Sequence, residues 1–530
     1  MKRRTVLRGI AATAAAAAAT GARVAIAQPA RARTLRLAPQ ANLTLRDPHF
    51  TTTQVTTNHA WAIYDTLFAI TANGDPRPQM AAGYSIEDDG RTCLITLRDG
   101  LKFHNGEPVL ARDCAQSLIR WAAREALGQT ASRFIDSWGV RDDRTVKISL
   151  KRPLPLLIPI LARGGGSIPF IMPESIARTD PYKQVTEIIG SGPFRFVKDE
   201  FVPGSRVTYV RNADYVPRQE PVDWTSGGKI AHFDRIEWHI IPDAATASAA
   251  LQSGEIDWYK HVQPDLLPLL RANPNIVIAD ANPTGFNGIM RFNHIQPPFN
   301  NVAIRRAVMM AVDQGDYMAS ITAADPTAFR VCKSLLPCDT PDGREIGASA
   351  MPGDLDRARA ALKAAGYNNE KVVIISSTDF VTIGPLGDVS YDLLKRLGMN
   401  VEIVQTDWGT VTQRRASKET VDKGGWSMMH TWGSTTTIGN PVGQFFMRGM
   451  GDRGWFGWFK DDTIEQLTEQ WLLAPTDQER ASIADAIQTQ AFQTVPSVPL
   501  GQFKIRTALR RNLTGYIVAT GAFPWNIRRV

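Results

Sequence analysis

The chain of 530 residues is too long for one small domain, and its composition, 43% hydrophobic and 21% charged, is that of an ordinary soluble globular protein with two or three domains. The formal net charge is +8, but residues 1–27 hold five basic side chains and no acidic one, which leaves 55 basic against 52 acidic side chains, or about +3. This balance argues against a nucleic-acid-binding surface and leaves nucleic acid out of the expected partners.

The N-terminal segment, residues 1–27, is typical of an export signal. It has a basic start, a weakly apolar and alanine-rich middle at residues 9–19, and Ala25-Ile26-Ala27 at its end. The stretch Arg3-Arg4-Thr5-Val6-Leu7-Arg8 resembles the twin-arginine pattern, so we expect that export route. The apolar core is too short for a membrane anchor, and no cysteine for a lipid anchor follows the expected cleavage site. We therefore predict a soluble periplasmic protein of the Gram-negative type.

Strands and helices alternate along the next part of the chain. Alternating apolar residues predict strands at 34–38, 91–98 and 144–150, with a hairpin pair over 81–103, and helical spacing predicts helices at 57–70 and 108–126. The proline-rich segment 153–173 indicates a packed irregular region.

The sequence Gly190-Ser191-Gly192 raises the question of a phosphate-binding loop. Such a loop requires GxxxxGK[ST] or GxGxxG at the start of a helix, and neither form is present. Pro193 and Phe194 instead begin an alternating stretch, which continues at 207–210 after a Pro203-Gly204 turn. We interpret the two glycines as a turn that leads into a strand.

The second half of the chain repeats the alternation of helices and strands. Helical spacing predicts helices at 354–365, 386–397 and 462–492, and two apolar runs predict strands at 372–376 and 401–404. This order favours an α/β fold.

Four cysteines allow at most two disulfides in an oxidising compartment. Cys332 and Cys338 lie close together in a proline-containing loop, so we predict a disulfide between them. Cys93 in a strand-like run and Cys114 in a helix-like run are expected to be buried thiols.

A long segment at 81–118, AAGYSIEDDGRTCLITLRDGLKFHNGEPVLARDCAQSL, resembles the family 5 extracellular solute-binding proteins of ABC importers, the dipeptide-, oligopeptide- and nickel-binding group. The glycine turn matches the family's G-T-G-P-[FY] element, and the segments 250–259, 297–314, 354–367 and 479–500 resemble family segments in the expected order. The resemblance extends over residues 33–530.

The resemblance implies a two-lobe periplasmic binding protein fold of the α/β class, with an extra subdomain inserted in lobe I. Lobe I would comprise 33–72, 190–288 and 503–530, the insertion 73–189, and lobe II 289–502, with hinge segments near 285–292 and 501–507. Such a protein, expected here as a monomer, closes over a ligand and docks on a permease that is driven by an ATPase.

The motifs of common enzymes are absent from the sequence. It contains no HExxH, GxSxG, Walker A or CxxC motif, and its eight histidines lack ligand spacing. The carboxylate pairs Asp88-Asp89, Asp142-Asp143 and Asp461-Asp462 lie in turn-like settings and are interpreted as solvated turns or helix caps. We therefore expect no enzyme activity, no cofactor and no metal.

The segment 430–441 is the main ligand-binding candidate. Dipeptide binders carry a Gly-Trp here, then an Asp that pairs with the peptide's amino group; Trp432 matches, Thr435 or Thr436 stands in the acid's place, and Asn440 follows. No arginine occurs at 376–388, where one would hold a carboxylate. Both differences argue against a free dipeptide and favour a neutral or weakly charged organic solute, with a longer peptide bound through its backbone as the alternative.

Other ligand-binding candidates come from tryptophans and polar loops. Trp408, Trp426, Trp432, Trp455 and Trp458 cluster in the last third, with core packing as the alternative for each. The loops 47–54 and 163–167 and the hinge-proximal 286–287 are candidates with ordinary surface loops as the alternative. The predicted ligand-binding residues are Thr52, Thr53, Ser167, Phe286, Trp408, Trp432, Thr435, Thr436 and Asn440.

The predicted function is the periplasmic substrate-binding component of an ABC importer, which captures a peptide or small organic solute. A periplasmic hydrolase on the same fold and a sensor or chaperone-like protein are the alternatives. Turnover of a bound solute would identify a hydrolase, and the absence of neighbouring permease and ATPase genes would favour a sensor.

Overall fold

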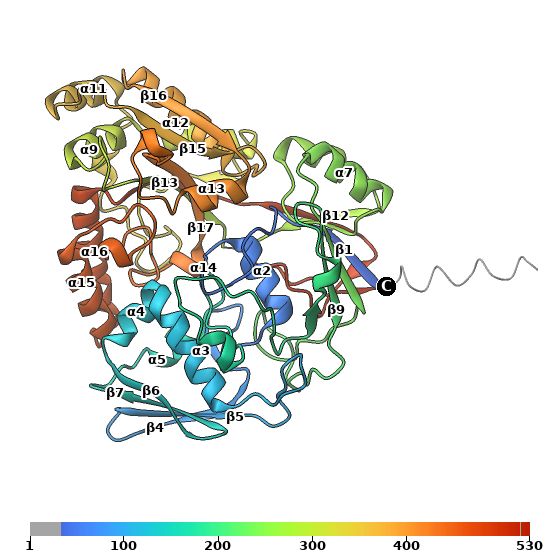
Figure 1. The fold of residues 1–530 in the computed structure, drawn as a ribbon. Coiled ribbons are helices and arrows are strands. Elements are labelled where there is room, and N and C mark those ends of the chain that lie inside the picture. Colours follow the sequence, from blue (N-terminus) through green and yellow to red (C-terminus); the bar gives the residue numbers. More distant parts are fainter. Residues whose placement is uncertain (1–32, 283, 520) are drawn as a thin grey trace, which may run out of the picture.

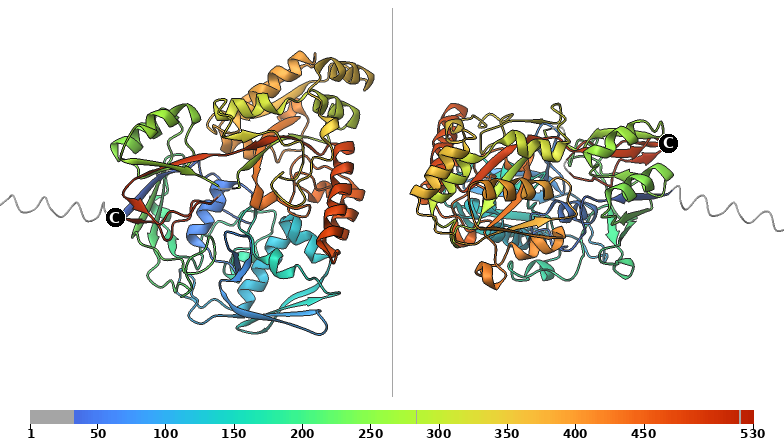
Figure 2. Two further views of the ribbon diagram at one scale, coloured as in Figure 1. Left: turned by 180° about the vertical axis from the view of Figure 1, so that it is seen from behind. Right: turned by 90° about the horizontal axis from the view of Figure 1, so that it is seen from above.

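The computed structural model describes residues 33–282, 284–519 and 521–530, so the predicted export signal lies outside the described residues. The strands form two large β-sheets and one four-stranded sheet, and the helices pack around these sheets (Figures 1 and 2). In Figure 1 the sheet that contains β13 and β15 lies at the upper left, the sheet that contains β1 and β9 lies at the right, and the four-stranded sheet lies at the bottom.

The first large sheet has seven strands in the order β12-β19-β11-β1-β10-β9-β8. β1 pairs in parallel with β10 and β11, whereas the other neighbours are antiparallel. The strands are β1 (Thr34–Ala38), β8 (Phe194–Phe196), β9 (Arg206–Arg211), β10 (Arg235–His239), β11 (Trp258–Tyr259), β12 (Ile276–Asp280) and β19 (Arg506–Arg510). Helices α2 (Gln54–Ile63), α7 (Ala244–Ser253) and α8 (Leu267–Arg271) accompany it. The predicted strand at 34–38 is confirmed.

The glycine turn before β8 packs directly on the end of α2. The N–H of Gly192 donates to the carbonyl of Ile63 at 2.7 Å. A Cβ at Gly190 would lie 2.1 Å from the same carbonyl oxygen, so no larger residue fits there. The turn-and-strand interpretation of this motif is confirmed, with β8 following it.

The second large sheet has six strands in the order β14-β18-β13-β17-β15-β16. β15 is parallel to β16 and β17, and β13 is antiparallel to β17 and β18. The strands are β13 (Phe286–Phe292), β14 (Phe329–Arg330), β15 (Val372–Ser377), β16 (Val401–Thr406), β17 (Met428–Ser434) and β18 (Ser497–Phe503). The helices are α9 (Val302–Ala311), α10 (Gln314–Thr322), α11 (Leu355–Ala364), α12 (Gly384–Arg396), α13 (Trp408–Arg414), α14 (Thr435–Ile438), α15 (Asp462–Leu473) and α16 (Asp477–Thr494).

The helix predicted over 462–492 is two helices, α15 and α16. Pro475 interrupts the pattern, because a proline disfavours helical backbone in the residue before it. The Thr476 hydroxyl then accepts the N–H of Glu479 and caps the start of α16.

The four-stranded sheet is antiparallel in the order β4-β5-β7-β6, with α3 packed on β6 and β7. Its elements are β4 (Ala81–Glu87), β5 (Thr92–Leu97), β6 (Ile135–Asp142), β7 (Thr145–Leu150), α3 (Ala111–Arg124), α4 (Ala126–Ser132), α5 (Leu157–Leu161) and α6 (Glu174–Ala177). The predicted hairpin and strand are confirmed, whereas the irregular region expected at 153–173 contains α5.

The helix predicted at 57–70 is wrong in its second half. Helix α2 ends at Ile63, and Phe68–Ile70 forms β2, which pairs with β3 (Pro76–Pro78). Asp65 redirects the chain, because one of its carboxylate oxygens accepts the N–H of Thr66 and lies 2.7 Å from the buried Nζ of Lys229. A short hairpin of β20 (Leu513–Thr514) and β21 (Arg528–Arg529) lies near the C-terminus.

The chain passes between the two large sheets at 281–285 and at 504–505. The first of these passages lies just before the expected hinge segment 285–292, most of which is strand β13. The second lies inside the expected segment 501–507.

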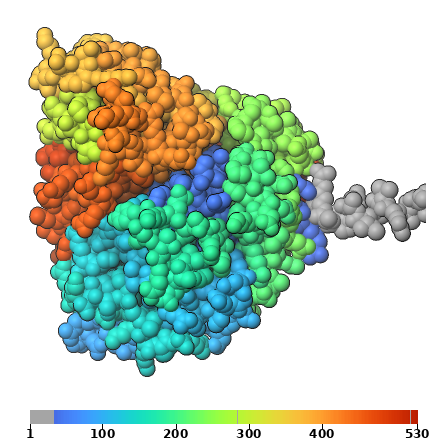
Figure 3. Space-filling view, viewed as in Figure 1, coloured from blue at the N-terminus to red at the C-terminus, as the bar shows by residue number. Residues whose placement is uncertain are grey.

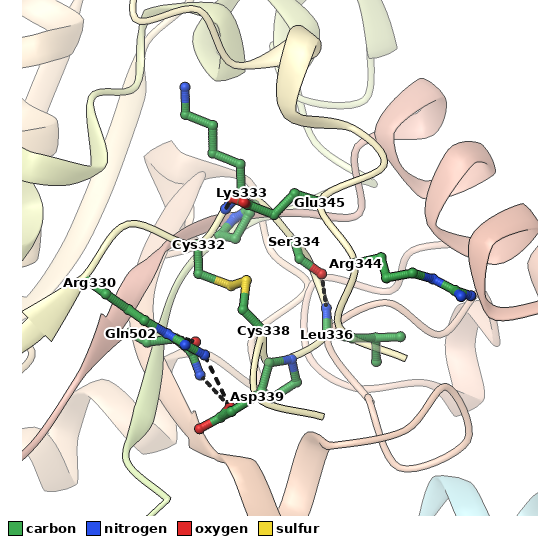
Figure 4. The surroundings of a disulfide bond; sticks show 12 residues. Arg330, Cys332, Lys333, Ser334, Leu336, Cys338, Asp339, Arg344, Glu345 and Gln502 are labelled. Atoms are coloured by element: carbon green, nitrogen blue, oxygen red, sulfur yellow. Dashed lines mark hydrogen bonds and ion pairs between the residues drawn. A yellow bond between two sulfur atoms is a disulfide. The ribbon is translucent and has the colours of Figure 1, made fainter. Parts of the chain in front are cut away.

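The disulfide expected between Cys332 and Cys338 is present, with the two Cα atoms 6.0 Å apart (Figure 4). It closes a loop whose backbone is also held by the Gln314 side chain, since Oε1 of Gln314 accepts the N–H of Cys332 at 2.7 Å. Cys93 and Cys114 are buried free thiols, as expected.

Candidate ligand-binding site

A cavity of about 510 Å³ lies where lobe-forming segments from distant parts of the chain meet. This volume falls within the range of pockets that hold drug-sized ligands. The lining residues come from segment 45–52 and from the α3–α4 region together with Ser167, Tyr182 and Gln184. The others come from segments 412–418 and 445–458, which connect strands of the second large sheet. In Figure 3 the orange and cyan parts of the chain, which carry two of these walls, meet along a common border.

Segment 45–52 is held in place by a buried ion pair. Asp47 and Arg120 are fully buried, with the carboxylate 2.6 Å from Nη2 of the guanidinium. The Asp47 carboxylate also accepts the N–H groups of His49 and Val185, each at 3.0 Å. Because both charges are paired and hydrogen-bonded, the loop that carries Thr52 into the cavity is fixed to α3.

Aromatic rings form much of the cavity wall that segment 445–458 contributes. The Trp455 ring lies 5.7 Å from that of Phe445 and 5.4 Å from that of Phe456, measured between centroids. Nε1 of Trp455 donates to Oγ1 of Thr52 at 3.3 Å, across residues 403 positions apart. Flat apolar faces with a polar handle suit an organic ligand held by stacking and hydrogen bonds.

Arg415, directly after α13, is the most buried charged residue of the cavity lining. Its residue surface is 2% exposed, and Nε and Nη2 are buried without a hydrogen-bond partner among the described residues. The guanidinium lies 4.5 Å from the ring centroid of Phe456 and 5.4 Å from that of Trp455. Burial lowers the pKa of Arg415 to about 9.

The carboxylates that line the same cavity already have partners. Glu125 caps α4, since one oxygen accepts the N–H of Gly128 at 2.8 Å, and its other oxygen lies 3.6 Å from Nη2 of Arg163. Asp452 lies 2.7 Å from Nζ of Lys418. Burial also lowers the pKa of His49 to about 4, which leaves its ring neutral at physiological pH.

A smaller space of about 50 Å³ adjoins the main cavity and shares Thr52, Arg415, Phe445 and Trp455 with it. Trp432 and Phe380 line it, with ring centroids 5.8 Å apart. Nε1 of Trp432 donates to Oγ1 of Thr382 at 3.1 Å. Trp432 is thus partly core and partly cavity wall.

Five of the nine residues predicted from the sequence line these spaces. Thr52 and Ser167 line the main cavity, and Thr52, Thr53, Trp408 and Trp432 line the smaller one.

The other four predicted residues line neither space. Phe286 is fully buried behind Trp432, with ring centroids 4.5 Å apart. The hydroxyls of Thr435 and Thr436 are engaged by the Thr284 carbonyl and the Ser434 hydroxyl, and the side-chain oxygen of Asn440 accepts the N–H of Gly443. The structure therefore places the stand-ins for the acid outside the cavity wall.

Sequence reasoning missed Arg415, Phe445, Phe456 and Glu125. Arg415 stands beside Arg414 in an ordinary helix end, and Glu125 follows a helix that ends in arginine. No local pattern separates these charges from solvated ones, because their burial depends on segments distant in sequence. Trp455 belongs to the group of five tryptophans named from the sequence, and that group was the one sequence feature that indicated this aromatic wall.

The carboxylate pairs behave as turns and caps. Asp88 and Asp89 have positive φ of 53° in the turn between β4 and β5. The Asp142 carboxylate accepts the N–H of Arg144, and that of Asp461 accepts the N–H of Ile464 at the start of α15.

The described residues include no cluster of His, Cys, Asp and Glu that could hold a metal ion. Within residues 33–530, leaving out 283 and 520, no helix is long and apolar enough to cross a membrane.

Comparison with known families decides the class of this protein. The family model for the bacterial extracellular solute-binding proteins, family 5, matches residues 75–453. The chain belongs to this family. This family 5 protein is 39% identical over 501 residues to the probable peptide ABC transporter periplasmic-binding protein y4tO of Sinorhizobium fredii, which covers 94% of this chain and 93% of that protein. The glutathione-binding protein GsiB of Shigella dysenteriae is 25% identical, with 92% of each chain covered.

Solved structures show the same fold. The family 5 protein superimposes with a TM-score of 0.78 and 19% identity on the binding protein AgaA of A. tumefaciens R10 in complex with agropinic acid, covering 94% of this chain and 99% of that one. The TM-score is 0.74, with 21% identity and coverage of 95% and 99%, for DppA of Helicobacter pylori in complex with the peptide STSA. The predicted two-lobe α/β fold is confirmed.

Proposed function

We propose that this family 5 protein captures a peptide or a small organic solute in the periplasm and delivers it to the permease of an ABC importer. The observation that carries the proposal is the cavity of about 510 Å³, whose walls come from both sides of the two chain passages at 281–285 and 504–505. A site built in this way is completed only when the two lobes approach each other. Its partly aromatic and partly polar lining supports a ligand of a few polar groups on an organic frame.

The domain assignment follows the three sheets. Lobe I contains the seven-stranded sheet, the insertion contains the four-stranded sheet, and lobe II contains the six-stranded sheet. We place the hinge in the passages at 281–285 and 504–505, because these segments are the two connections between the large sheets.

The site binds and releases its ligand unchanged. Its polar groups, among them Thr52, Ser167 and Arg415, supply hydrogen bonds and charge, whereas an acid–base pair aimed at one reacting point is absent from the described lining. A bound solute recovered with unaltered mass supports this assignment, and its conversion to a product would establish a hydrolase instead.

Native mass spectrometry of the protein as purified is the first experiment, because a co-purified solute identifies the ligand directly. Adding that solute to stripped protein should raise the melting temperature by mass action and decrease the radius of gyration in small-angle scattering. Intrinsic fluorescence should change as well, since Trp432 and Trp455 line the cavity walls. Tight binding without any change in scattering would contradict lobe closure.

Export and assembly complete the proposal. We infer that residues 1–27 direct the precursor through the twin-arginine route and that the mature protein acts as a periplasmic monomer. Replacing both Arg3 and Arg4 by lysine should leave the precursor in the cytoplasm. A normal periplasmic yield of that variant would contradict the route, and a dimeric mass in light scattering would contradict the monomer.

A further inference from the structure

Arg415 differs from four other deeply buried arginines of this protein. Arg120, Arg291, Arg305 and Arg448 all lie at 5% exposure or less, and each donates to carboxylates, carbonyls or hydroxyls. At Arg415, both Nε and Nη2 are buried without a hydrogen-bond partner among the described residues. Such a group loses its hydration and gains no hydrogen bond in exchange, which destabilises the fold.

Aromatic rings orient Arg415, and no ion pair among the described residues includes it. Trp408, Trp455 and Phe456 place their ring centroids 6.0, 5.4 and 4.5 Å from its Cζ atom. Ring faces attract a cation, yet they leave its N–H groups free to donate in the plane of the guanidinium. Arg415 lines both the main cavity and the smaller space, so a ligand in either one would lie beside this side chain.

The charges around the main cavity add to the same asymmetry. Its lining contains Arg124, Arg415, Lys418 and Arg453 but only two carboxylates, Glu125 and Asp452. Lys418 and Asp452 pair at 2.7 Å, and Glu125 is bound to the α4 N-terminus. The cations of the wall therefore exceed its anions, and Nε and Nη2 of its most buried cation, Arg415, have no hydrogen-bond partner among the described residues.

We infer that the solute is an organic acid and that Arg415 binds its carboxylate, with the rings of Trp408, Trp455 and Phe456 around the ion pair. The inference rests on the proposed function and names the class of its ligand. A planar guanidinium presents two parallel N–H groups that match the two oxygens of a carboxylate. Discrimination against the uncharged analogue follows, because that analogue leaves the buried charge unpaired. The acid is thus anchored from lobe II, by a residue outside segment 376–388.

The test uses matched acids and amides. Stripped protein is titrated by calorimetry with the dipeptide Met-Leu, with its C-terminal amide and with mannopinic acid. Arg415→Met keeps the length of the side chain and removes its charge. Arg415→Lys keeps the charge without the paired N–H groups of the guanidinium. Arg357→Met, on the exposed face of α11, is the matched control. We expect wild type and the control to prefer an acid over its amide at least tenfold. Arg415→Met should lose at least tenfold in affinity for the acid together with the preference, and Arg415→Lys should lie between them.

A melt without ligand provides a second readout. If Arg415 serves the ligand, Arg415→Met removes an unpaired buried charge, and its ligand-free melting temperature should equal or exceed that of wild type. A clearly lower melting temperature would assign Arg415 to the core and overturn the inference, as would equal affinity of wild type for acid and amide. If none of the three probes binds to wild type, the ligand-free melt decides.

The outcomes separate this inference from the proposed function. A neutral solute that binds tightly and closes the lobes leaves the transport function in place and overturns the assignment of an acid. An acid that binds through Arg415 without any decrease in the radius of gyration supports the assignment and contradicts delivery by lobe closure.

Discussion

The guanidinium of Arg448 donates to the hydroxyl of Thr130, with Nη2 and Oγ1 2.7 Å apart, although 318 positions separate the two residues in the chain. Thr130 belongs to α4, which contacts β6 of the four-stranded sheet. Arg448 lies between β17 and β18 of the six-stranded sheet in the chain, and both oxygens of the Glu465 carboxylate accept from its guanidinium at 2.8 and 2.6 Å. This hydrogen bond joins the two sides of the cavity, and we expect it to form when the lobes close.

Thr130→Val should therefore weaken ligand binding without unfolding the protein. The variant keeps the shape of the side chain and removes a hydrogen bond to a charged group, which is worth about 1.5 kcal/mol, or about tenfold in affinity. Arg448 keeps its partner Glu465. Calorimetry with the co-purified solute measures the effect. Thr489→Val is the control, because both hydroxyls also donate to the carbonyl four residues earlier in their helix. Equal losses in the two variants would show that the lobe contact contributes nothing.

Gly165→Ala should oppose closure by a steric contact. A Cβ at Gly165 would lie 2.3 Å from Oγ1 of Thr437, a hydroxyl that is held 2.7 Å from Oγ of Ser434. We expect a weaker affinity, a larger radius of gyration with ligand and an unchanged ligand-free melt. Adding Thr437→Ala to Gly165→Ala should restore binding, since the second substitution removes the Oγ1 atom with which the new Cβ clashes. Gly83→Ala, which would contact nothing within 4 Å, is the control. Failure of the double variant to recover would point to strain within the 163–167 loop itself.

Thr435→Asp should destabilise the protein rather than create an amine-binding site. Thr435 is 8% exposed, and its hydroxyl donates to the carbonyl of Thr284 at 2.8 Å, next to the first chain passage. An ionised carboxylate cannot donate there, and an unsatisfied buried polar group costs about 1–3 kcal/mol. Thr435→Ser retains the donor and should melt close to wild type. Thermal melts measure both variants. A gain in affinity for amine-bearing peptides with an unchanged melt would instead place Thr435 in the binding site.

The stability of the ligand-free protein should fall as the pH is lowered from about 6.5 to 4. Burial lowers the pKa of His430 to about 3 and that of His59 to about 3, so both stay neutral in the folded state. The unfolded chain takes up these protons below about pH 6.5, which favours unfolding by about 1.4 kcal/mol per pH unit for each histidine. The stabilising contribution is complete above the unfolded pKa and is lost as the pH falls toward the folded one.

Denaturant unfolding at several pH values measures this slope. His430→Gln should decrease the slope by about one proton, and His239→Gln at the end of β10 serves as the control variant. A flat stability profile down to pH 4 in wild type would contradict the burial of neutral histidines.

Reduction of the Cys332–Cys338 disulfide should lower the free energy of unfolding. The bond closes a loop between cysteines six positions apart, and the chain-entropy model assigns about 2 kcal/mol to a loop of this size. The variant with serine at both positions should unfold at lower denaturant than wild type and should ignore dithiothreitol. If reductant leaves wild type unchanged as well, the loop is held by other contacts, such as the bond from the Cys332 N–H to Gln314.

Local sequence predicted the elements whose stability comes from local periodicity. The strands at 34–38 and 372–376 alternate or run apolar between turn residues, and each was found at its place. The hairpin over β4 and β5 was found for the same reason. The helix predicted at 57–70 failed, because β2 at its end is formed by pairing with β3 and by the bond of Asp65 to Lys229, which lies 164 positions away.

The sequence by itself determined the family, the α/β class and the disulfide, because these depend on composition, spacing and motifs that stand within short segments. Only the tertiary structure decided which side chains line the cavity. Thr435 stands where dipeptide binders have an acid, but its hydroxyl donates to a backbone carbonyl. Arg415 belongs to no recognised motif, yet it is buried against Trp455 and Phe456, about 40 positions further along the chain. The physical reason is that burial and unpaired charge are properties of segments brought together by folding, and no local pattern records which segments those are.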